Sequence, residues 1–247
     1  MLRRDVYVTG RELPIFLAQV ILQPLFLLFI FGKVLTQLGY AHNNYAQILF
    51  PGMVSLATVL TALQSTAMPL VMEFSYTKEI EDRLLAPMPV WLVAVEKIVF
   101  ATVRAMIAAA VMFPVGILIL GSIPFKARDA GLVVLFITLG GLVGAAIGMV
   151  LGTLVPPNRI NIMFALILTP LLFTGASQYP WPSLSHIRWF QVVTGCNPLT
   201  YVSEGMRGSM LTGVPHIAIW ISFLVLIGAL AVLLAIGLRG FMRRAVT

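Results

Sequence analysis

Charged residues gather in one short segment of an otherwise apolar chain. Five of the six residues from 78 to 83 are charged, and prolines follow at positions 87 and 89. At helical spacing Tyr76, Ile80 and Leu84 share one face, while oppositely charged side chains four residues apart occupy the others. The pattern predicts a short amphipathic helix that docks on a partner protein or lies on a membrane surface, although a solvated loop would also explain the charges.

A second segment, 178–210, is rich in proline, tryptophan and glycine, and begins with Tyr179-Pro180-Trp181-Pro182 shortly before Trp189-Phe190. Tryptophan and tyrosine are enriched at membrane–water interfaces. The composition therefore indicates either ordinary interfacial anchoring or short helices that enter the outer leaflet. Glu204 and Arg207 lie three residues apart, which predicts a local ion pair on a helix.

Residue patterns for several other kinds of chemistry are absent from the sequence. It contains no G-x-x-x-x-G-K-[ST] phosphate loop and no Cys/His cluster with metal-ligand spacing, and the single cysteine, Cys196, excludes an internal disulfide. Ion-coupled carriers hold ionisable residues at membrane depth, and none falls in the long apolar stretches. We therefore expect a chain that is not an enzyme and holds no cofactor, so uphill transport would need energy from a partner.

The overall composition excludes a water-soluble globule. Of the 247 residues, 60% are hydrophobic and 10% are charged, whereas soluble domains have about 45–50% apolar and about 25% charged residues. The net charge is +7. In a membrane protein a basic excess normally sets topology, so nucleic acid is not an expected partner.

Stretches without Asp, Glu, Lys or Arg mark the expected membrane spans, because about 20 apolar residues cross a bilayer core and a central charge costs about 2.5–3.5 kcal/mol. Six stretches are long enough, which predicts an all-α polytopic membrane protein with one domain over residues 1–247. The charge-free stretches are 13–32, 34–72, 105–125, 130–158, 160–187 and 208–238. The expected spans placed on them are 13–32, 47–72, 99–121, 130–155, 160–177 and 216–238, the third of which begins shortly before Arg104. A cytoplasmic loop, 73–95, follows the second span, and an external segment, 178–210, follows the fifth.

Basic residues predict the orientation of these spans. Six spans place both termini on one side, where eleven Lys and Arg residues gather against five on the other. Cytoplasmic segments carry the excess of basic residues, so both termini are expected in the cytoplasm. No small-residue cleavage site follows the basic N-terminal residues, so the first span is expected to remain in the mature protein.

Four glycines recur at intervals of four residues within the expected fourth span. Small residues at this spacing line one helix face and let a second backbone approach closely. We therefore assign to helix packing the residues Gly140, Gly144, Gly148 and Gly152.

Motifs in two of these segments resemble those of a known family. Residues Glu79 to Pro87, with the sequence EIEDRLLAP, are similar to the cytoplasmic loop of the ABC-2 type permeases, the membrane subunits of bacterial ABC exporters. Phe173-Thr174-Gly175-Ala176, Asn197-Pro198-Leu199-Thr200-Tyr201 and Arg207 are similar to that family's F-x-S-G … N-P-x-x-Y … R pattern, with Thr174 in place of the usual serine. The resemblance covers nearly the whole chain, and is closest to the daunorubicin-exporter-like and nodulation-exporter-like branch.

The resemblance implies six transmembrane helices, an amphipathic connecting helix over 1–12, a cytoplasmic coupling helix and external re-entrant helices between spans five and six. It assigns coupling to a separate ATPase subunit to Lys78, Glu79, Glu81, Asp82 and Arg83. It assigns the external re-entrant motif to Asn197, Pro198, Tyr201, Glu204 and Arg207. Family members pair two permeases, identical or homologous, with two ATPases that bind ATP and Mg²⁺, in the bacterial inner membrane and its lipids.

The same resemblance implies a substrate pathway formed mainly by spans one, two and five. The polar residues on those spans are Gln19, Gln23, Ser55, Thr58, Ser65, Asn161 and Thr169. Each of these side chains could equally make an ordinary hydrogen bond between helices, and such a bond contributes only about 0.6 kcal/mol on average.

These observations predict the permease subunit of an ATP-driven ABC exporter. The lack of charge along the spans favours export of a hydrophobic or amphipathic substrate, such as a drug or a lipid, including multidrug export. A polysaccharide or glycolipid exporter of the same family is an alternative. A self-sufficient passive pore or carrier and a membrane protein with only a structural role are further alternatives, and a co-purifying ATPase would distinguish the exporter from them.

Overall fold

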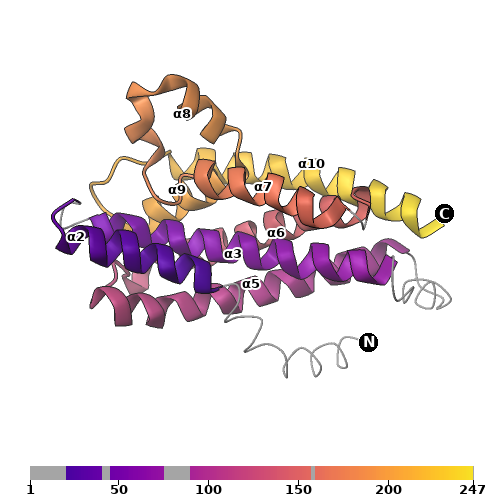
Figure 1. Ribbon diagram of the computed structural model, residues 1–247, viewed down its shortest axis with the longest axis horizontal. Helices are drawn as coiled ribbons and strands as arrows, with labels where there is room; N and C mark the ends of the chain where they lie inside the picture. The colour runs from indigo at the N-terminus through magenta and orange to yellow at the C-terminus, as the bar shows by residue number, and fades with distance from the viewer. Residues whose placement is uncertain (1–20, 41–44, 75–89, 157–158, 247) are drawn as a thin grey trace.

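Helices form the fold throughout the part of the chain that the computed structural model describes, residues 21–40, 45–74, 90–156 and 159–246 (Figure 1). No strand occurs in those ranges. The α-helices are α2 (Leu35–Gln37), α3 (Tyr45–Met72), α5 (Val90–Leu120), α6 (Ala130–Leu154), α7 (Ile160–Thr174), α8 (Arg188–Gly195), α9 (Pro198–Met210) and α10 (Ile219–Val246). A π-helical stretch, η1 (Leu28–Val34), and two 3₁₀ helices, η3 (Ala127–Asp129) and η5 (Trp181–His186), complete the described elements.

Four of these helices, α3, α5, α6 and α10, are long and apolar enough to cross a membrane. They correspond to the second, third, fourth and sixth expected spans. The described parts of the first and fifth expected spans form shorter apolar helices, Ile21–Gln37 and Phe164–Thr174. The structure therefore shows four candidate spans and two shorter apolar helices.

The long helices lie side by side, and the central ones are α3 and α6 (Figure 1). In the most apolar part of each helix, 83% of the residues of α3 and 72% of those of α6 are buried, against 28% in α5 and 11% in α10. Helix α10 is apolar on all sides, which is the pattern of a helix whose exposed face meets lipid. The core of the bundle is therefore the contact between α3 and α6, with α5 and α10 on its outside.

Glycine residues make the contact between α3 and α6 close. A Cβ added to Gly144 would lie 2.6 Å from the carbonyl oxygen of Val59, and one added to Gly148 would lie 2.4 Å from that of Leu63. A Cβ added to Gly152 would lie 2.8 Å from Cβ of Leu70 in α3, and one added to Gly140 would lie 2.8 Å from the side chain of Val202 in α9. All four glycines thus lie at contacts where a larger side chain would push two helices apart.

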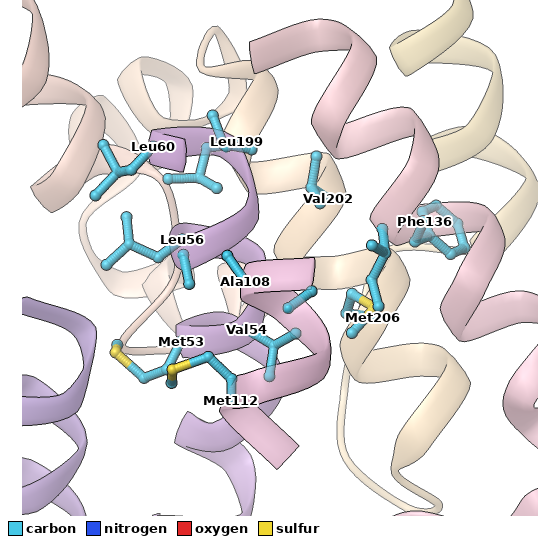
Figure 2. Close-up of a cluster of buried hydrophobic side chains, with 14 of the residues drawn as sticks. Met53, Val54, Leu56, Leu60, Ala108, Met112, Phe136, Leu199, Val202 and Met206 are labelled. Atoms are coloured by element: carbon cyan, nitrogen blue, oxygen red, sulfur yellow. The ribbon is translucent and has the colours of Figure 1, made fainter. Parts of the chain in front are cut away.

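The short helix α9 is buried at one end of the bundle, packed against α3, α6 and α10. Figure 2 shows Val202 and Met206 of α9 within the apolar cluster that also contains Met53 of α3, Met112 of α5 and Phe136 of α6. Helix α8 protrudes from the bundle beside it (Figure 1). We call this the α9 end; the opposite end, where α3 and α10 finish, is the C-terminal end.

Helix α5 begins earlier than the span expected from the charges. It starts at Val90 and runs through Glu96 and Lys97 without a break. Lys97 forms an ion pair with Glu73 near the end of α3, and both side chains are largely buried. A partner for the charge explains why the helix can continue through a position that charge counting places outside the span.

Candidate functional site

A fully buried ion pair lies within α9. Arg207 Nη1 donates to Glu204 Oε1, and both side chains are 0% exposed. The two residues are three apart on one helix, as expected for a local pair. Their complete burial makes the pair more than a local contact, because each charge has left water and needs every polar atom satisfied.

Backbone groups from four other segments satisfy the rest of this pair. Arg207 Nε donates to the carbonyl oxygen of Ile48 in α3 at 3.2 Å, and Nη2 donates to that of Ala176 after α7 at 2.9 Å. Glu204 accepts hydrogen bonds from the backbone N–H groups of Trp181 in η5 at 3.0 Å and of Ile217 before α10 at 2.9 Å. The pair therefore holds α3, α9 and the segments beside α7 and α10 together at the α9 end.

Asn197 links the beginning of α9 to the end of α7. Its Oδ1 accepts from the N–H of Leu199 at 2.9 Å and caps α9, and Pro198 occupies a first-turn position where no N–H is required. Its Nδ2 donates to the carbonyl of Leu171 at 3.1 Å and to Oγ1 of Thr174 at 2.9 Å. Thr174, which replaces serine in the motif, thus uses the hydroxyl that both residues possess.

Three tyrosine hydroxyls make further hydrogen bonds at the α9 end. Tyr201 donates to the carbonyl of Gly195 at 2.8 Å, and Tyr45 donates to that of Gln178 at 2.9 Å. Tyr179 donates to the carbonyl of Phe173, and burial raises its pKa to about 12. The family motifs include Tyr201 and Ala176, whereas nothing in the sequence marks Tyr45 as a member of this network.

The C-terminal end contains a second cluster, which joins four helices. Besides the Glu73–Lys97 pair of α3 and α5, the ring of Phe74 lies 5.4 Å from that of Phe241 in α10. Arg244 lies 5.0 Å from the centre of the Phe74 ring and donates to the carbonyl of Gly152, near the end of α6, at 3.0 Å. The cluster directly precedes the segment 75–89, so the candidate coupling residues Lys78, Glu79, Glu81, Asp82 and Arg83 lie outside the described residues.

The polar residues suggested for a substrate pathway lie in different environments. Ser55 and Thr58 are buried and donate to backbone carbonyls one turn earlier in α3, at 2.9 Å and 2.7 Å. Ser65 is also buried, while Gln23 and Thr169 are exposed. Gln19 and the side chain of Asn161 lie outside what the structure describes. The assignment of a pathway to these positions stays a prediction.

No three His, Cys, Asp or Glu side chains gather in a way that could hold a metal ion anywhere in the described part of the chain. The geometry instead offers two polar clusters that connect helices at opposite ends of an apolar bundle.

Comparisons with known proteins agree with this architecture. Residues 1–211 match the family described as ABC-2 type transporter. A protein of Cyanophora paradoxa named "Putative transport permease ycf38" is 28% identical over 217 residues, which is 84% of this chain and 72% of that protein. No solved structure matches the chain. With its several apolar helices and a family match over most of its length, the chain is a multi-pass membrane protein that belongs to the ABC-2 type transporter family.

Proposed function

We propose that the chain is the membrane-spanning permease subunit of an ATP-driven exporter, which moves a hydrophobic or amphipathic substrate out of the cytoplasm. A separate ATPase subunit supplies the energy, in two copies beside two permease subunits, and holds ATP and Mg²⁺. Family membership supports the transport role. The largely uncharged surfaces of the described spans favour an apolar cargo, drug-like or lipid-like, over a polyanion.

The observation that carries this proposal is the cluster at the C-terminal end. Glu73, Phe74, Lys97, Phe241 and Arg244 connect α3, α5, α6 and α10 at the point where the segment with the five clustered charges begins. A force on that segment from a partner would therefore reach four helices at once. This is the mechanical arrangement that a permease driven by a separate ATPase requires, because the two nucleotide states must contact the segment with different energies.

The α9 end has the complementary role in this proposal. Helix α9 fills the end of the bundle, and the Glu204–Arg207 pair fixes it to α3, to η5 and to the segment before α10. Opening of a pathway at this end must move these segments together or break the pair. Each charged side chain is satisfied by the other and by backbone groups. The pair is therefore better suited to a structural role than to the relay of ions.

In this proposal the chain lies in the inner membrane of a bacterium, with both termini in the cytoplasm. The distribution of basic residues supports that orientation. Arg159, Arg239, Arg243 and Arg244 belong to the C-terminal end, where α6 and α10 finish and α7 begins. Lys33, Lys126, Arg128, Arg188 and the paired Arg207 belong to the opposite end, which also has Asp129 and Glu204. Over the whole sequence, eleven Lys and Arg residues fall on the side expected to hold both termini and five on the other, and such a basic excess is the pattern of a cytoplasmic side.

The proposal is tested by purifying the chain in mild detergent from its host, identifying bound proteins by mass spectrometry and assaying ATP hydrolysis. We expect a stoichiometric ATPase whose hydrolysis responds to apolar drugs or lipids. Charge reversal of Glu79 together with Arg83 should leave hydrolysis in place and abolish export into vesicles. Arg188→Glu, at an exposed position of the α9 end, is the matched control. A lone, ATP-indifferent oligomer would contradict the proposal and indicate a passive pore or a scaffold.

A further inference from the structure

A cavity of about 500 Å³ lies between α5 and α6 at the α9 end. It is lined only by apolar side chains, and its walls include Met106, Ala110, Phe113, Ile117, Phe125 and Val134. The volume is within the range of small-molecule sites, which is about 300–1,000 Å³. The cavity is separate from the Glu204–Arg207 network and from the candidate pathway residues.

The position of the cavity corresponds to one leaflet of a bilayer. Along α5 its wall extends from Met106 to Ile117, a rise of about 16 Å. A bilayer core is about 30 Å thick, so this length is that of one layer of acyl chains. Ile117 and Val134 are each 50% exposed on the outside of the bundle, so the cavity opens toward lipid.

Basic side chains lie at the membrane-surface end of the same cavity. Phe125 and Ala130 both line it, and between them the chain carries Lys126 and Arg128, both exposed. Arg128 also contacts Asp129, with Nε 3.3 Å from Oδ1, which leaves a net positive charge at the mouth. An apolar slot with a cationic rim has the charge and polarity of a lipid with an anionic headgroup.

We propose that this cavity binds one acyl chain of an anionic phospholipid, with the lipid phosphate beside Lys126 and Arg128. A drug with internal polar groups would find no hydrogen-bond partner on the walls, whereas an acyl chain needs none. The long stems of Lys126 and Arg128 can follow apolar surface while their charged ends reach the headgroup level. The site is independent of the proposed exporter function, since a passive pore or a scaffold could hold the same lipid.

The test uses the full chain, purified in mild detergent and mixed with equal amounts of phosphatidylglycerol and phosphatidylcholine. Native mass spectrometry then measures which lipid stays bound as detergent is removed. We expect one retained phosphatidylglycerol per chain, with a preference that falls about fivefold or more in Lys126→Gln/Arg128→Gln, because each basic residue near an anionic headgroup contributes about 1 kcal/mol. Arg188→Gln, which removes an exposed charge elsewhere at the same end, should keep the preference.

A second pair of variants tests the cavity itself. Ala110→Phe fills it from α5 and Val134→Phe fills it from α6, and both positions are exposed in the chain, which limits the risk of misfolding. Both should lose the retained lipid, whereas Ala231→Phe, on the exposed surface of α10, should not. Equal retention in the cavity-filling variants, equal retention of both lipids by the unmodified chain, or recovery of a drug-like molecule or a second protein chain in place of lipid would each overturn the assignment.

Discussion

The two ends of the bundle each contain a buried ion pair, but the pairs differ in how completely their charges are satisfied. At the α9 end Glu204 and Arg207 are 0% exposed, and five backbone groups complete their hydrogen bonds. At the C-terminal end Glu73 and Lys97 keep 11% and 13% of their side-chain surface, and Oε2 of Glu73 is buried without a hydrogen-bond partner among the described residues.

The difference indicates that the two ends respond differently to force. A pair held by many groups moves only with all of them, because an unpaired buried charge is expensive. A pair with fewer partners at the edge of the bundle can break and form again at lower cost. We therefore expect the groups at the α9 end to move together, and the pair at the C-terminal end to break at lower cost.

The largest effect is expected from removing one charge of the α9 pair. Arg207→Met leaves Glu204 buried without its counter-ion, and should destabilise the protein by about 3–5 kcal/mol. Glu204→Gln combined with Arg207→Met removes both charges, and should be less destabilised than the single variant. Thermal melting in detergent would measure both. A double variant that is less stable than Arg207→Met would contradict the view that the unpaired charge is the main cost.

A smaller effect is expected from crowding the contact between α3 and α6. Gly148→Ala places a methyl group against the backbone carbonyl of Leu63, and should cost about 1–3 kcal/mol because two helices must separate. A Cβ added to Gly228 in α10 would meet no neighbouring atom within 4 Å, so Gly228→Ala is the control and should not lower the melting temperature. Equal loss in both variants would mean that helix propensity, and not the close approach, decides the result.

Glu73→Gln, at the C-terminal end, weakens the bond to Lys97 and should lower the stability by about 1–3 kcal/mol. Its main effect should be to reduce the coupling of ATP hydrolysis to transport, measured as transport per ATP hydrolysed in the assembled transporter. The exchange of charges in Glu73→Lys/Lys97→Glu should restore part of that ratio. Measurement of export and hydrolysis on the same vesicles would check this, and an unchanged ratio in Glu73→Gln would remove the pair from the route of coupling.

The smallest effect is expected at Tyr179. Its pKa is raised from 10.0 to about 12, so the unfolded chain releases the phenol proton at lower pH than the folded protein. The contribution of this group to stability is complete below pH 10 and is lost as the pH rises toward 12. Tyr179→Phe should lose about 1 kcal/mol at neutral pH with its hydrogen bond to Phe173, and its melting temperature should fall less steeply between those pH values. Parallel melting curves for both proteins would contradict the assignment.

The long central helices and the motif residues could be predicted from the sequence, because apolar length and small-residue spacing act locally. Four of the expected spans overlap α3, α5, α6 and α10, which are long and apolar enough to cross a membrane. Helix α5 begins before the third expected span, since charge counting does not show that Lys97 meets Glu73 from another helix.

The candidate site was predictable only in part, and for a similar reason. The spacing of Glu204 and Arg207 indicates a pair on any helix, exposed or buried. Their role depends on Ile48 and Ala176, which are distant in sequence, and on Ile217 in the next segment, and all three contribute only backbone atoms. Nearly every residue has the same backbone N–H and C=O groups, so the residue type does not show which of them will bind a side chain. Contacts of this kind can be identified only from the three-dimensional arrangement of the helices.

Helix α10 is attached at both of its ends, although most of its surface is exposed. Just before it begins, the N–H of Ile217 is bound to Glu204, and near its last turn Arg244 is bound to the carbonyl of Gly152 in α6. Between these two attachments one face of α10 packs along α6, where Gly237 lies against Met149 and Gly240 against Thr153, and the other face is exposed. The helix therefore cannot slide along its axis unless an attachment breaks, so a displacement of its C-terminal end would be carried along the same helix to Glu204 at the α9 end.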